Sequence, residues 1–140
     1  MRKIIILISI FALQGCMTTS NLTSQQQNYL DKAMNQPLTF TVDSAHVEKA
    51  WGWAQSYIAK YSSMKIQNAT DYVIQTYNPG MHDAMYGYKV VKTDIQDKYE
   101  LTVNCFTGNV FTAKAAEKNA HILAYYLKTG ENPPPEIISK

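Results

Sequence analysis

The chain has 140 residues and a near-neutral charge, with 13 Lys and Arg against 11 Asp and Glu. This length fits one domain with a modest core. The charge balance excludes the basic face that nucleic-acid binding needs and the polybasic patch that anionic lipid attracts. We therefore expect no nucleic-acid partner.

The first 16 residues have the order of a bacterial export signal. Arg2 and Lys3 precede a nearly unbroken apolar run over 4–13. A bilayer-spanning helix needs about 20 apolar residues, so this shorter run is typical of a signal-peptide core. The run ends in Leu13-Gln14-Gly15-Cys16, which resembles the lipobox of bacterial lipoproteins.

The resemblance implies cleavage between Gly15 and Cys16, a diacylglycerol on the Cys16 thiol, and acyl chains that anchor the protein in a membrane. Loss of Arg2 and Lys3 leaves 11 basic and 11 acidic residues. In enterobacterial lipoproteins an Asp after the cysteine commonly causes retention in the inner membrane. Because Met17 stands there, we expect the outer membrane, facing the periplasm. The alternative is an ordinary secretory signal with an unrelated cysteine.

The chain then divides into three further parts. We expect residues 16–24 to form a lipidated tether, 25–130 a single periplasmic domain, and 131–140 a proline-rich C-terminal tail, extended and exposed.

The first half of the domain combines helical and alternating patterns. Helical spacing predicts a short helix over 24–36, and alternation predicts a strand over 38–42. Asp43 or Ser44 can cap a long helix that ends near residue 62. Its apolar stripe consists of Val47, Ala50, Trp51, Ala54, Ile58 and Tyr61.

The second half is predicted to be mostly strands. Residues 64–77 read as one strand with an irregularity at 68–71, since β-branched and aromatic residues favour a pleated surface. Further strands are expected over 86–93 and 98–106, joined by a polar reversal.

A long helix over 112–129 completes the domain, with Gly130 as its C-terminal cap. Strands joined by short turns pair antiparallel. We therefore expect a two-layer α+β fold, with an antiparallel sheet and two long amphipathic helices packed on one face. This element order is similar to that of the TBP-like and helix-grip domains of some envelope lipoproteins, a likeness of topology alone.

Catalytic motifs are absent from the sequence: it contains no P-loop, G-x-S-x-G, H-E-x-x-H or C-x-x-C. Cys105 with His121 could act as nucleophile and base, but the strand pattern places Cys105 on the core face, where we expect a buried, unreactive thiol. The carboxylates of Asp94, Asp97 and Glu100 read as a solvated turn. We therefore expect neither enzymatic activity nor a cofactor.

The segment Met81-His82-Asp83-Ala84-Met85 offers soft ligands. Two thioethers and an imidazole could bind Cu(I). The alternative is a loop whose methionines pack on the sheet. Because one short cluster without repeats is a sparse ligand set, we expect no tight metal site at Met81, His82 and Met85.

A candidate partner surface lies on the long helix at 44–62. His46, Trp53 and Tyr57 project together on the flank of its apolar stripe. Exposed Trp and Tyr offer large contact area at small entropy cost. The alternative is that these side chains cover the sheet edge or pack against the helix at 24–36.

The sequence thus predicts a non-enzymatic lipoprotein, held in the membrane through Cys16, that binds another envelope protein. The alternative is an envelope lipoprotein that binds a small ligand or a metal. A hydrolase acting on cell-wall or lipid material is a third class, and no catalytic residues support it.

Overall fold

The computed structural model describes residues 21–140. The lipobox residues Gly15 and Cys16 lie outside this range. The described elements, in chain order, are α1 (Ser24–Met34), β1 (Thr39–Asp43), α2 (Ser44–Tyr61), β2 (Ile66–Ala69), β3 (Val73–Thr76), β4 (Tyr86–Ile95), β5 (Lys98–Thr107), the 3-10 turn η1 (Val110–Thr112), α3 (Ala113–Thr129) and the 3-10 turn η2 (Pro135–Ile137).

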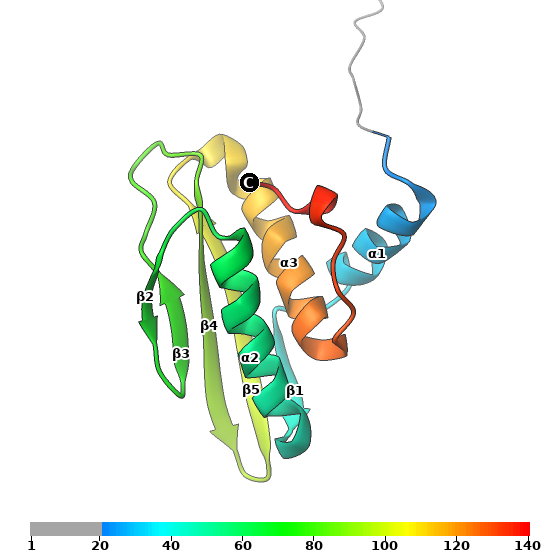
Figure 1. Ribbon diagram of the computed structural model, residues 1–140, viewed down its shortest axis with the longest axis vertical. Coiled ribbons are helices and arrows are strands. Elements are labelled where there is room, and N and C mark those ends of the chain that lie inside the picture. Colours follow the sequence, from blue (N-terminus) through cyan, green and yellow to red (C-terminus); the bar gives the residue numbers. More distant parts are fainter. Residues whose placement is uncertain (1–20) are drawn as a thin grey trace, which may run out of the picture.

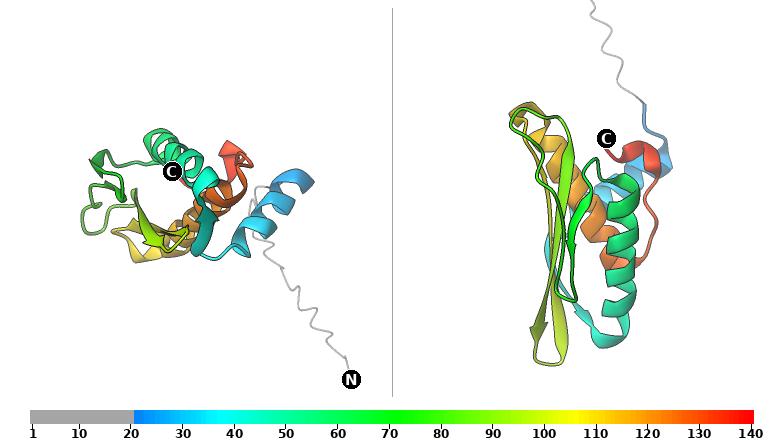
Figure 2. Two further views of the ribbon diagram at one scale, coloured as in Figure 1. Left: turned by 90° about the horizontal axis from the view of Figure 1, so that it is seen from below. Right: turned by 60° about the vertical axis from the view of Figure 1, so that its left-hand side comes forward.

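The five described strands form one antiparallel sheet in the order β1-β5-β4-β3-β2. The helices α2 and α3 cover one face of the sheet, and within residues 21–140 the other face carries no helix (Figures 1 and 2). The expected two-layer α+β fold is therefore confirmed. The shorter α1 packs against α3, where the rings of Tyr29 and Tyr125 meet edge to face at 5.1 Å.

Helix ends follow the local chemistry of the sequence. Thr23 and Gln26 form a capping box at α1, each side chain accepting from the other's backbone N–H. The Asp43 carboxylate accepts from the His46 N–H at the start of α2. Gly130 ends α3 with a φ of 75°, the left-handed conformation in which glycine has no Cβ penalty.

The segment 64–77 forms two strands, where we expected one irregular strand. β2 and β3 pair as a hairpin around residues 70–72. The hydroxyl of Thr70 accepts from the backbone N–H groups of Tyr72 and Val73, and the Thr70 N–H bonds Val73 O at 2.8 Å. These local bonds close the turn, because a Thr hydroxyl competes with strand hydrogen bonding.

The core lies between the sheet and the helices α2 and α3. Its members on the sheet are buried side chains that alternate along the strands: Phe40, Val42, Ile74, Tyr86, Tyr88, Val90, Leu101 and Val103. The helix α2 contributes the apolar stripe that we expected, except that Tyr57 takes the place of Tyr61 in the core. Tyr57 is buried and Tyr61, which we expected in the core, is half-buried at the end of α2.

The C-terminal segment 131–140 is part of the fold, contrary to the expected exposed tail. It runs back along α3 (Figure 1), and Ile137 and Ile138 are 2% and 5% exposed. The buried Asn119 of α3 exchanges two hydrogen bonds of 2.9 Å with the backbone of Ser139. The prolines favour an extended backbone, as we expected. This extended segment is nevertheless not exposed, because its isoleucines pack into the apolar core.

Candidate functional site

The expected partner surface on α2 is an internal contact. Tyr57 is 2% exposed. Trp53 is half-buried, and its ring lies 5.4 Å from the ring of His46 and 5.5 Å from that of Tyr126 on α3. His46 Nε2 donates to Leu127 O at 2.8 Å. The prediction of a free surface was therefore wrong, because α3 packs against this flank of α2.

The structure does not bring together the candidate catalytic residues of the sequence. His121 Nδ1 donates to Gln36 O at 2.8 Å, which ties α3 to the segment between α1 and β1. Cys105 is paired with Tyr88 across the β4–β5 hairpin. Asp94 and Asp97 lie exposed near the β4–β5 turn, and Glu100 is half-buried on β5. This exposure is consistent with the prediction that these carboxylates belong to a solvated turn.

Cys105 is on the core face as expected, but it is half-buried and not fully buried. It lies two residues before the end of β5, and none of the last four residues of this strand is fully buried. Burial raises the pKa of its thiol to about 12. The thiolate, which is the reactive form, is therefore scarce at neutral pH.

The methionine-rich loop is exposed. Met81 and Met85 are 83% and 48% exposed, so they do not pack on the sheet as the alternative to metal binding required. His82 has a left-handed backbone, with a φ of 73°, and is also exposed. No group of three or more His, Cys, Asp or Glu side chains that could hold a metal occurs within residues 21–140.

This loop, residues 77–85, lies against a second loop, residues 107–112, and we call the two together the loop pair. The register of the central hairpin brings them together, since Tyr86, which follows the first loop, pairs with Thr107, which begins the second. Both therefore extend from the same end of the sheet (Figure 1).

Three hydrogen bonds join the two loops. The His82 N–H donates to Gly108 O at 2.9 Å, and Asn109 Nδ2 donates to His82 O at 3.3 Å. The Thr107 hydroxyl donates to Asp83 O at 3.2 Å. The loop pair is thus held in one arrangement, which lowers the entropy cost of binding.

Five large apolar or aromatic side chains are exposed on the loop pair, and we call them the apolar tip. They are Tyr77 at 52%, Met81 at 83%, Met85 at 48%, Val110 at 82% and Phe111 at 93% exposed. Single exposed hydrophobic residues are ordinary, whereas a cluster of them marks an interaction site. The only Asp, Glu, Lys or Arg in the loop pair is Asp83, whose carboxylate accepts from the Gly80 N–H.

Our sequence reasoning missed two of the three most exposed side chains of the apolar tip, Val110 and Phe111. A signal was present: they stand between the break at residues 107–109 and the helix that follows, outside any periodic pattern. Two large hydrophobic residues with no core position assigned to them are a reason to look for an exposed site.

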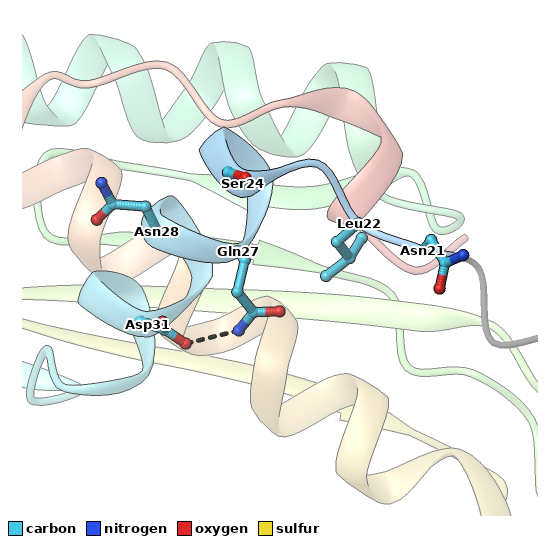
Figure 3. Close-up of a pocket in the computed structure, with 6 residues that line it drawn as sticks. All are labelled: Asn21, Leu22, Ser24, Gln27, Asn28 and Asp31. Atoms are coloured by element: carbon cyan, nitrogen blue, oxygen red, sulfur yellow. Dashed lines mark hydrogen bonds between the residues drawn. The ribbon is translucent and has the colours of Figure 1, made fainter.

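Two hollows on the surface carry no converging polar groups. One, of about 710 Å³, is an open depression on α1 whose labelled side chains point in different directions, with Gln27 bonded to Asp31 at 2.7 Å (Figure 3). The other, of about 320 Å³, lies between α2 and the C-terminal segment, beside Tyr61, Tyr126 and Pro133. Neither arrangement is typical of an active site.

No family model, curated protein or solved structure matches this chain. The likeness to TBP-like and helix-grip domains therefore stays a prediction from element order. Within the described range, none of the helices has the length and apolar character needed to cross a bilayer.

Proposed function

We propose that this protein is a lipid-anchored envelope protein, without enzymatic activity, that binds another envelope protein through the apolar tip. The single observation that carries the binding role is the exposure of five large side chains on two loops that are bonded to each other. Aromatic residues and Met are enriched in protein interfaces, and Met side chains adapt their shape to a partner.

The anchoring part of the proposal is supported by the lipobox Leu13-Gln14-Gly15-Cys16. Two or three acyl chains on Cys16 supply an attachment that one chain alone does not give. Met17, after the cysteine, supports a position in the outer membrane facing the periplasm. The domain itself is then free to act as a binding module.

Two experiments in intact cells test the two parts separately. For the anchor, Cys16→Ser should abolish lipidation and leave an uncut or soluble protein. If a mature Cys16→Ser protein still fractionates with membranes, the anchor is not on Cys16. For binding, the double variant Val110→Ser/Phe111→Ser should lose chemical crosslinks to a partner protein identified by mass spectrometry.

The matched control is Ile95→Ser, which replaces an exposed apolar residue (39% exposed) at the opposite end of β4. This variant should retain the crosslinks of the wild-type protein. Equal crosslinking by all three proteins would remove the apolar tip as the binding surface. Unchanged melting temperatures would confirm that both variants remain folded.

A further inference from the structure

The apolar tip and the start of the described chain lie at the same end of the molecule. In Figure 1 the loop pair and the first turn of α1 are both at the upper end of the long axis, and the β4–β5 turn is at the lower end. The right-hand view of Figure 2 shows the same arrangement. The end of the domain where the described chain begins is therefore also the end that presents the exposed apolar residues.

The lipid anchor restricts how far this end can be from the bilayer. Five peptide units join Cys16 to Asn21, where the described structure begins, and a fully extended chain covers at most about 3.6 Å per residue. Asn21, three residues before α1 begins, is thus held within about 18 Å of the lipid-modified cysteine. This keeps the loop-pair end of the domain close to the membrane surface, while the β4–β5 turn extends away from it.

We infer that the partner of the apolar tip is an integral membrane protein, bound where an apolar segment of it emerges at the bilayer surface. The inference rests on the proposed function, since it needs the anchor on Cys16. It adds the class of partner: a protein embedded in the same membrane, as opposed to a soluble protein or a cell-wall component.

Two observations favour a protein over the lipid surface itself. First, the loop pair contains no Lys or Arg, and its one formal charge is the Asp83 carboxylate. Recognition of anionic lipid relies on clusters of basic residues, and a carboxylate is repelled by anionic headgroups.

Second, the loop pair has a fixed shape. The three hydrogen bonds between its loops hold residues 82–83 against residues 107–109, next to Met81 and Val110. A fluid lipid surface adapts to any arrangement of apolar side chains, whereas a protein surface needs a complementary one. A preformed arrangement is therefore more useful toward a folded partner.

Photo-crosslinking of the full-length, lipidated protein in cells tests the inference. The photoreactive residue p-benzoylphenylalanine is placed at Phe111, and at Gln96 in the exposed β4–β5 turn as the control. We expect the position-111 probe to form an adduct with a protein that resists alkaline extraction from membranes, and the position-96 probe to form none. Adding Val110→Ser to the position-111 probe should reduce the adduct.

A second variant tests membrane proximity directly. A flexible insertion of about 30 Gly and Ser residues between Ser20 and Asn21 lets the domain move away from the bilayer. We expect the adduct to fall about ten-fold, because effective concentration declines as a tether lengthens. A soluble partner would give an adduct that is insensitive to the insertion.

Each other outcome contradicts the inference in a distinguishable way. Adducts to lipid alone would make the bilayer the occupant, and adducts to a soluble protein would place the partner away from the membrane. No adduct from a protein that does fractionate with membranes would reject the apolar tip as the docking surface while the anchor remains. If the wild-type protein is unlipidated and soluble, the proposed function itself fails.

Discussion

Gly108 lies against the backbone of Gly80, so close that a methyl group on its Cα would overlap the Gly80 carbonyl oxygen. The obstacle is main chain, which cannot rotate away as a side chain can. Hydrogen is therefore the only side chain that allows residues 77–85 and 107–112 to meet. The whole loop pair depends on this contact.

Gly108→Ala is accordingly expected to separate the two loops. The free energy of unfolding should fall by about 1–3 kcal/mol, the cost of overpacking a close contact, and crosslinking from position 111 should fall with it. Urea denaturation followed by tryptophan fluorescence measures the first effect.

Gly52→Ala is the control for this change. Gly52 lies exposed in α2, with nothing within 4 Å of the added Cβ. Alanine there should raise stability by about 0.5–1 kcal/mol, because glycine inside a helix loses more backbone entropy on folding. Equal effects of the two substitutions would mean that the Gly108 contact does not hold the loops.

Trp53→Ala is expected to weaken the fold without affecting the partner. The Trp53 ring fills the space over Gly130, where an added Cβ would come within 2.7 Å of it, and packs against Tyr126. Because Trp53 is half-buried, the loss should be about 2–3 kcal/mol, below that of a fully buried Trp. Ser56→Ala, an exposed change on the same helix, should cost little. Reduced crosslinking with unchanged stability would restore Trp53 as a partner residue.

Asn119→Ala should release the C-terminal segment from α3. The Asn119 side chain is fully buried and bonds both the N–H and the C=O of Ser139. Its loss leaves backbone groups unpaired, at a cost of about 1–3 kcal/mol. Proteolysis between 131 and 140 should become faster. Glu117→Ala, at an exposed position of the same helix, is the control, and equal protease resistance of both variants would contradict the role of Asn119.

The thiol of Cys105 should react slowly with iodoacetamide in the folded protein. With its pKa near 12, only about one thiol in ten thousand is ionised at pH 8. A cysteine introduced at the exposed position Val110, in a Cys105→Ser background, serves as the reference and should react about a hundred-fold faster. Comparable rates at the two positions would show that Cys105 is reactive and revive its candidacy as a nucleophile.

Stability should decrease at alkaline pH. Burial raises the pKa of the Tyr57 and Tyr88 hydroxyls above its usual range in the folded protein. Since the unfolded chain ionises first, near pH 10, the stabilisation present below that pH is lost as pH rises toward the folded-state pKa. The urea midpoint should be constant between pH 7 and about 8.5 and fall above about 9.5.

Tyr88→Phe is the matched variant for this pH effect. The Tyr88 hydroxyl is buried and has no hydrogen-bond partner. Its removal should therefore preserve stability at pH 8, because a buried unsatisfied polar group is costly, and should reduce the alkaline decrease. An alkaline decrease that is identical in wild type and Tyr88→Phe would assign the effect to other groups.

Most of the elements were predictable from the sequence because their causes are local, and the β2–β3 hairpin is the exception. The Asp43 cap, the alternation along β5 and the left-handed Gly130 depend on residues a few positions away, through capping bonds, the two-residue strand period and glycine's freedom at positive φ. The central hairpin was also predictable, and with it the position of both loops at one end of the sheet.

Tertiary structure alone decided which side chains are free. By helical angle Tyr61 lies nearer the apolar stripe of α2 than Tyr57, yet Tyr57 is the buried one, because Tyr126 of α3 packs against its flank. The C-terminal segment also packs on α3 through a long-range contact. Asn119 is 20 residues away in sequence from its hydrogen-bond partner Ser139. The apolar tip exists because Gly108 lets two distant loops touch. Such long-range contacts depend on how whole elements pack, and no window of neighbouring residues contains that information.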